Sequence, residues 1–250
     1  MRTIGLLVVF GAIFARAIPS CFAQIVDDSF GSGTDAGWTH LEPLSSFGAQ
    51  GTYGFPNGGY RIQASASPDP AHLGPARAGS FRYDTYTVNY DTEVDVVGFN
   101  SNLNQSFGLI GHVTAPGVGT TSGYAGTVST TGSINLWLIQ GEVMTLLDTH
   151  PIVVDPTHSY RLFLSGNSTG IGFEVRDLQN PRNGGAVGGG AKTFPIGLSG
   201  LFAMSNVPGG TADATFDDFR AFVNVPEPST WSLLAGGAIL FSLFFRRSEP

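Results

Sequence analysis

Three carboxylates alternate along one short stretch of the sequence, at Asp91, Glu93 and Asp95. Successive side chains of a β-strand point to opposite faces, so these three would share one face at steps of about 6.6 Å. A retaining glycosidase needs two carboxyl groups about 5–5.5 Å apart, and neighbours in such a row could approach that separation. The row is therefore compatible with catalysis by Glu93 and Asp95, with ligand binding, or with a solvated polar face, and we expect the polar face.

The other side chains that could take part in catalysis or binding form no recognisable motif. The histidines occur in no His-x-His or His-Glu-x-x-His motif, so the sequence does not support a zinc site. Large aromatic side chains could stack on sugar rings if they were exposed, although most aromatics of a β-sandwich belong to its core. The candidates for stacking are Trp38, Tyr53, Phe55, Tyr60 and Trp137.

The acidic row lies within a series of short segments that alternate apolar and polar residues. The longest predicted strand is 87–97, with Val88, Tyr90, Thr92, Val94 and Val96 on the face opposite the carboxylates. Residues 134–140 and 142–147 predict a hairpin around Gly141, and the glycine-rich stretch 180–190 predicts a loop. Further strands are predicted at 60–64, 107–113, 123–128, 160–164, 171–176, 196–204 and 215–222. Many short strands without helices between them predict an all-β fold, an antiparallel β-sandwich or jelly roll.

Composition restricts the partners of this predicted domain. The chain has a net charge of −7 and a single lysine, Lys192. Nucleic acids and anionic membrane surfaces require basic patches, so we expect neither as a partner. The only cysteine is Cys21, so an internal disulfide is impossible and packing or bound ions must hold the fold.

The N-terminal residues predict export. Arg2 precedes an apolar run from residue 4 to residue 14, and small residues follow, as in a secretory signal peptide. Cleavage by signal peptidase is expected after Ala23, which gives a signal peptide of residues 1–23, with Ala17 as the alternative site. Lipid attachment at Cys21 is a second alternative, although the proline at position 19 fits that motif poorly.

The other end of the sequence, residues 225–250, carries a second targeting pattern. Val225, Pro226, Glu227 and Pro228 precede an uncharged apolar stretch, 231–245, which Arg246 and Arg247 follow. As a transmembrane helix this stretch would span roughly 23 Å, short of the ~30 Å hydrocarbon core. The arginines would remain on the cytoplasmic side. A buried helix of a soluble domain is the alternative.

This order of features resembles the PEP-CTERM protein-sorting tail of exported bacterial proteins. The resemblance implies an exosortase-type processing enzyme as a partner and an association with extracellular polysaccharide. It also implies transient anchoring in the inner membrane of a Gram-negative-type bacterium, followed by release to the cell envelope or extracellular matrix.

The central domain, residues 24–224, is similar to the concanavalin A-like lectin/glucanase (LamG-like) jelly roll. The similarity rests on an opening Asp27-Asp28-x-Phe30, the strand series and a closing Phe-Asp-Asp-Phe at 216–219. Residues 93–95 resemble the start of the Glu-x-Asp-x-x-Glu motif of glucanases with this fold. Gly98 stands where the last glutamate, the acid/base, belongs.

The same resemblance suggests a structural calcium ion. First and last strands usually pair in this fold, which would bring Asp28 near Asp218. Calcium takes six to eight oxygen ligands, and these two carboxylates could supply part of the set. Solvated strand ends are the alternative, and no cofactor is required by the sequence.

We therefore expect an exported, non-catalytic β-sandwich that binds exopolysaccharide. An exported glycoside hydrolase using the Asp91, Glu93 and Asp95 row is the alternative. Without a carboxyl group at position 98 the leaving group receives no proton, which favours the non-catalytic interpretation.

Removal of the tail tests the predicted sorting. We expect deletion of residues 226–250 to move the protein from the cell envelope to the medium, because the deletion removes the apolar stretch that would hold it. Fractionation followed by immunoblotting measures this shift, and an unchanged distribution between envelope and medium would refute the prediction.

Overall fold

The computed structural model describes residues 21–167, 169–190 and 193–225. Residues 1–20 of the predicted signal peptide 1–23 and the predicted helix 231–245 lie outside these residues, whereas residues 21–23 belong to the first strand, β1 (Cys21–Asp28). None of the helical turns in this described part of the chain could span a lipid bilayer. Residues Gln24–Val223 form one compact unit.

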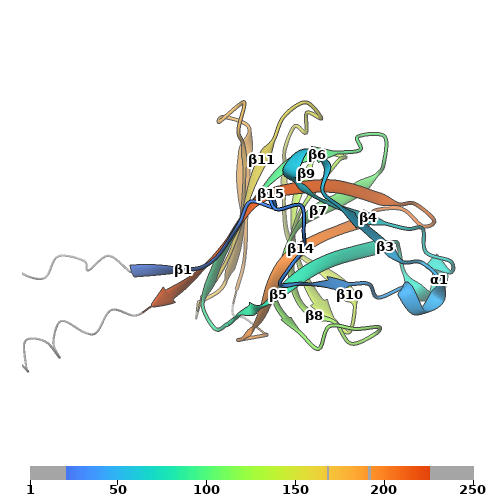
Figure 1. Cartoon of the computed structure of the whole chain (residues 1–250), viewed down its shortest axis with the longest axis horizontal. Coiled ribbons are helices and arrows are strands. Elements are labelled where there is room, and N and C mark those ends of the chain that lie inside the picture. The colour runs from blue at the N-terminus through green and yellow to red at the C-terminus, as the bar shows by residue number, and fades with distance from the viewer. Residues whose placement is uncertain (1–20, 168, 191–192, 226–250) are drawn as a thin grey trace, which may run out of the picture. The chain divides into compact units, whose positions relative to one another are not determined.

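This unit consists of two sheets, here called sheet A and sheet B (Figure 1). Sheet A has the strand order β13-β12-β11-β6-β15-β4-β3, and β1 also pairs with β15. Its strands are β1 (Cys21–Asp28), β3 (Gly51–Gly54), β4 (Tyr60–Ala64), β6 (Tyr90–Phe99), β11 (Tyr160–Gly166), β12 (Ile171–Asp177), β13 (Gly184–Gly189) and β15 (Ala212–Val225).

Sheet B has the strand order β10-β9-β8-β7-β14-β5-β2. Its strands are β2 (Trp38–Leu41), β5 (Arg77–Thr87), β7 (Gln105–Thr114), β8 (Ser122–Ser129), β9 (Ser133–Gln140), β10 (Val143–Pro151) and β14 (Gly197–Ser205). Short helical turns occur at α1 (Pro70–Leu73), η1 (Ser45–Phe47) and η2 (Pro56–Gly58). The predicted antiparallel β-sandwich is confirmed, as is the hairpin of β9 and β10.

A core rich in aromatic rings fills the space between the sheets. Phe30 and Tyr60 stack with ring centroids 5.0 Å apart, and Trp38 of sheet B meets Phe219 of sheet A edge to face at 4.8 Å. Because side chains alternate along a strand, sheet B carries a second apolar cluster on its outer face. This outer cluster comprises Leu41, Phe81, Ile110, Val113, Ala125, Ile139, Leu198, Phe202 and Met204.

Two predicted elements are wrong. Residues 87–97 are not one strand, because β5 ends at Thr87 in sheet B and β6 begins at Tyr90 in sheet A. In the sequence, the alternation of apolar and polar residues continues through the turn because Val88 is apolar. Its side chain is nevertheless 50% exposed and does not belong to the buried face of a strand. The hydroxyl of Thr87 donates to the carbonyl of Asn89 and closes this turn.

The glycine-rich stretch 180–190 is not entirely a loop, since Gly184–Gly189 forms β13 beside β12. Its glycines allow close packing. A Cβ atom at Gly184 would lie 2.6 Å from the carbonyl oxygen of Val175, and one at Gly185 would lie 2.3 Å from the His150 ring. The composition that suggests a flexible loop is here required for the two sheet edges, β13 and β10, to meet.

The tight fit between the sheets gives a stability prediction. A methyl group at Gly126 would stand 2.1 Å from Cδ2 of the buried Phe173, whereas nothing lies within 4 Å of a Cβ atom at Gly54. We expect Gly126→Ala to lower the free energy of unfolding by about 1–3 kcal/mol through overpacking. Gly54→Ala is the matched control, and chemical denaturation that found equal stability for the two variants would contradict this packing.

Candidate functional site

The acidic row lies on the outer face of β6, in the middle of sheet A. Thr92, Val94 and Val96 alternate with the carboxylates and are buried. This part of the predicted alternation is therefore confirmed. Strand β11 flanks β6 on one side and β15 on the other.

Arginines from both flanking strands form ion pairs with two carboxylates of the row. Arg161 of β11 lies directly opposite Asp95 and donates two hydrogen bonds to its carboxylate, at 2.7 Å from Nε and 2.8 Å from Nη2. Asp95 is 8% exposed, so this two-pronged bond compensates for the water it has lost. The same hydrogen bond and charge raise the pKa of Arg161, which stays protonated.

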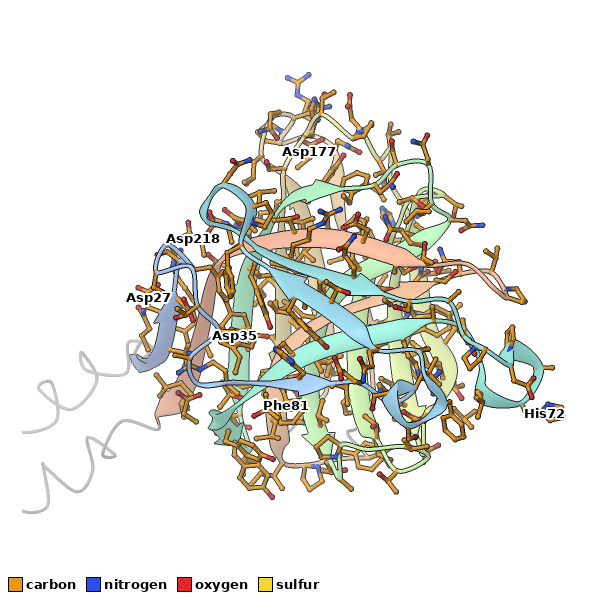
Figure 2. The ribbon with its side chains drawn as sticks, turned by 45° about the vertical axis from the view of Figure 1, so that its right-hand side comes forward. Asp27, Asp35, His72, Phe81, Asp177 and Asp218 are labelled. Carbon is orange, nitrogen blue, oxygen red and sulfur yellow. The ribbon has the colours of Figure 1, made fainter. Side chains whose placement is uncertain are left out.

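Glu93 is held in the same way from the other side. Nη1 of Arg220 on β15 lies 3.0 Å from its Oε1, and Arg161 lies 3.5 Å from the same oxygen. Arg220 also lies 3.7 Å from Asp27 and 3.6 Å from Asp218, two residues labelled on the same side of the molecule in Figure 2. Glu93 and Asp95 are thus members of an ion-paired network. The third carboxyl group of the row, Asp91, is partly buried, and this burial raises its pKa.

A β-bulge turns position 98 toward this face. Gly98 pairs with Thr215 and Val96 with Phe216, which leaves Val97 as the extra residue of β6. Gly98 consequently lines a cavity of about 620 Å³ together with Asp213, Thr215 and others. A Cβ atom there would come no closer than 3.9 Å to Thr215, so the site has room for a side chain that the sequence does not provide.

Asp217, which was not a predicted catalytic residue, lines the same cavity and lies directly opposite Asp95. Burial raises the pKa of Asp217, and the charges of Asp218, Asp95 and Asp28 raise it further. This carboxyl group therefore keeps its proton to a higher pH than an ordinary aspartate. Its place beside Asp95 depends on the β6–β15 register, which no local sequence signal reveals.

The two calcium candidates have separate partners. Asp28 accepts hydrogen bonds from the indole of Trp38 at 2.8 Å and from the backbone of Phe30 at 2.9 Å, and it lies 3.4 Å from Arg82. Asp218 faces Arg220. In the described part of the chain, no group of three or more His, Cys, Asp or Glu side chains is placed to hold a metal ion. Structural calcium remains a prediction.

A second candidate surface, the polar groove, lies on the outer face of sheet B and has a volume of about 390 Å³. Its lining contains hydroxyl, amide and apolar side chains and no ionisable one. The lining residues are Pro75, Asn104, Ser106, Ser129, Thr131, Ser133, Asn135, Trp137, Met204, Ser205 and Asn206. Sequence reasoning missed this groove because its members come from distant segments and individually resemble ordinary solvated residues.

The aromatic candidates for sugar stacking fall into two groups, core residues and one residue of the groove. Trp38 and Tyr60 are buried in the core, and Tyr53 and Phe55 pack against it. Trp137 instead lines the polar groove, where its Nε1 donates to the hydroxyl of Thr127 at 3.0 Å. This bond fixes the ring orientation within the groove.

Comparison with known families concerns the end of the chain. Residues 224–248 match the PEP-CTERM protein-sorting motif. The chain carries a PEP-CTERM motif. It includes Val225, Pro226, Glu227, Pro228, Arg246 and Arg247, whose resemblance to this motif is thereby confirmed. The PEP-CTERM motif indicates an exported protein that is processed at the cell envelope.

Solved structures resemble the sandwich itself. The carbohydrate-binding module CBM66 from Bacillus subtilis has a TM-score of 0.52 and 13% identity, covering 73% of this chain and 93% of that chain. A GlcNAcα1-4Gal-releasing endo-β-galactosidase from Clostridium perfringens has a TM-score of 0.56 and 14% identity, covering 84% and 66%.

The lectin UEA-II complexed with galactose has a TM-score of 0.53 and 8% identity, covering 80% and 98%. These likenesses establish the fold and agree with the concanavalin A-like resemblance, and they include both binding proteins and an enzyme. No curated protein matches the chain in sequence.

The ion pair at the centre of sheet A can be tested by removing one partner. We expect Asp95→Ala to lower the free energy of unfolding by about 1–3 kcal/mol, because the guanidinium of Arg161 loses a charged, largely buried acceptor. The control is Glu174→Ala, which breaks the exposed Glu174–Arg176 pair and should cost less than about 1 kcal/mol. Equal losses in chemical denaturation would show that Asp95 is not structurally engaged.

Proposed function

We propose that this protein is an exported carbohydrate-binding β-sandwich that does not hydrolyse its ligand. The observation that carries the proposal is the polar groove, which places amides, hydroxyls and one indole ring around a common space without an ionisable side chain. Such a set suits a sugar, because hydroxyl groups need both donors and acceptors while the C–H face of the ring needs an apolar surface.

The acidic row supports the non-catalytic part of the proposal. A glycosidase needs one carboxylate free to act as nucleophile or base and one protonated carboxyl group as the acid. Arg161 and Arg220 donate hydrogen bonds to Asp95 and Glu93, which restrains the two carboxylate side chains. These contacts are those of a structural network, and position 98 contributes no acid.

The PEP-CTERM motif supports the cellular part. We propose that signal peptidase removes residues 1–23 and that the helix 231–245 holds the protein in the inner membrane until an exosortase-type enzyme processes the tail. The sandwich then reaches the cell envelope or the extracellular matrix of a Gram-negative-type bacterium, where exopolysaccharide is its partner. Bound calcium is an optional addition, through Asp28 and Asp218.

Affinity electrophoresis tests the binding. We expect the full chain, in mild detergent, to be retarded in native gels that contain polysaccharide, because the groove binds the polymer reversibly. The panel includes β-glucan, xylan, galactan and the exopolysaccharide of the producing cells. Mobility that is unchanged in every gel relative to gels without polymer would refute the proposed function.

The raised pKa of Asp217 favours a second candidate, a glycosidase in which Asp217 donates the proton and Glu93 attacks the sugar. We expect no reducing ends to be released from the panel, because Glu93 is bound by arginine and Asp217 lies beside Asp95 rather than at position 98. Release that disappears in both Glu93→Gln and Asp217→Asn would establish the enzyme instead. A colorimetric assay of reducing ends over a day measures this.

A further inference from the structure

We infer that the polar groove binds an uncharged glycan chain that lies across the strands of sheet B, from β9 toward β14. The inference rests on the proposed carbohydrate binding and specifies which carbohydrates are recognised and in which direction they run. It follows from four features of the groove: its floor, its rim, its apolar flanks and its lack of charge.

The floor of the groove is a row of side chains in direct register across four strands. Ser133 of β9 lies opposite Ser129 of β8, Ser129 opposite Ser106 of β7, and Ser106 opposite Met204 of β14. Neighbouring strands lie about 4.8 Å apart, so the row is roughly 14 Å long. A glycan that runs along this row crosses four strands, so the row suits a short run of sugars rather than a single one.

The floor holds the amides of the rim in fixed positions. Ser106, which is 2% exposed, donates to Oδ1 of the exposed Asn206 at 2.7 Å. The amide nitrogen of Asn206 then donates to Ser129 and to Asn104, at 3.0 Å in each case. Rim amides that are already ordered lose little conformational entropy when a ligand binds, which favours affinity.

The β9 side of the groove is ordered in the same way. Asn135 donates to the hydroxyl of Ser133 at 2.9 Å and accepts a hydrogen bond from Thr149 at 2.7 Å. Trp137 lies two residues further along β9, on the same strand face, and its ring is fixed by Thr127. Amide, hydroxyl and indole groups thus present one continuous surface along β9.

Apolar side chains flank the row of the floor. Met204 is its last member on β14, and Trp137 lies beside the row, four residues along β9 from Ser133, with its indole bonded to Thr127, two residues from Ser129 on β8. A sugar ring has hydroxyl groups at its edge and C–H groups on its faces, so apolar contacts beside the row and at its β14 end, with polar contacts between them, suit a short run of sugars. A single sugar would leave either Trp137 or Met204 without a contact.

The absence of charge decides the class of glycan. The nearest cation in register is Arg77, which lies opposite Met204, but its guanidinium donates to the carbonyls of Leu73 and Pro75 and to Glu142. A uronic acid or sulfated sugar in the groove would lose water without gaining a cationic partner. The chain's net charge of −7 adds a general repulsion of polyanions.

Calorimetric titration of the full chain in detergent with oligosaccharides of two to six sugars tests the inference. Neutral fragments of β-glucan, xylan and galactan are compared with uronate fragments of pectate and alginate of equal length. We expect only neutral fragments to bind, with affinity rising with fragment length until the fragment fills the row and then levelling. We expect Trp137→Ala to weaken binding about tenfold, which corresponds to about 1.4 kcal/mol.

Two further variants control for folding and for position. Trp137→Phe keeps an aromatic ring without the bond to Thr127 and should bind with intermediate affinity. Tyr83→Ala removes an aromatic side chain of sheet B that is 65% exposed and lies outside the groove lining, and it should bind like the unaltered protein. Ser133→Arg, which places a cation at the start of β9, should allow uronate fragments to bind.

The outcomes separate the inference from the proposed function. Uronate fragments that bind the unaltered chain as tightly as neutral ones would overturn the inference while carbohydrate binding stands. Neutral binding that is unchanged in Trp137→Ala, Trp137→Phe and Ser133→Arg would equally show that the ligand lies elsewhere on the sandwich. If no fragment and no polymer binds, the proposed function itself fails.

Discussion

The whole molecule depends on the apolar contact between its two sheets, because a chain with one cysteine has no internal disulfide to support it. Rings from both sheets meet in that contact, as Trp38 and Phe219 do at 4.8 Å. Burial deprives the indole N–H of Trp38 of a hydrogen bond to water, and it donates instead to the carboxylate of Asp28 at 2.8 Å. Asp28, at the acidic end of β1, is in this way bonded to the core rather than left in solvent.

Because the inner faces of the two sheets are packed against each other, only their outer faces are open to a ligand, and the two outer faces differ in chemistry. The outer face of sheet A is a network of alternating charges in which each carboxylate of Glu93 and Asp95 has an arginine. The groove on sheet B is neutral, and its hydrogen bonds run mainly among serines and asparagines. Ion pairs restrain the side chains on the outer face of sheet A. The neutral polar groups of the groove on sheet B can instead exchange their bound water for sugar hydroxyl groups.

Local patterns were sufficient for part of this account. Alternation along residues 60–64 and 134–140 predicted strands that the structure contains, and the order of Pro226, Glu227, Pro228, Arg246 and Arg247 identified the sorting motif. The pattern failed at Val88, where an exposed apolar residue disguised a turn, and at β13, where glycines serve close packing. Local patterns also could not reveal the partners of the acidic row, because Asp95 and Arg161 are 66 residues apart and meet only through strand register. The groove was missed for the same reason.

We propose that this sandwich holds a glycan without cutting it. Saturation-transfer NMR on one sample of the full chain with a neutral tetrasaccharide measures both properties together. We expect transfer of saturation to the sugar protons while the anomeric signals of the tetrasaccharide remain unchanged over days. New anomeric signals from shorter products, or an absence of transfer to any neutral or charged oligosaccharide, would contradict it.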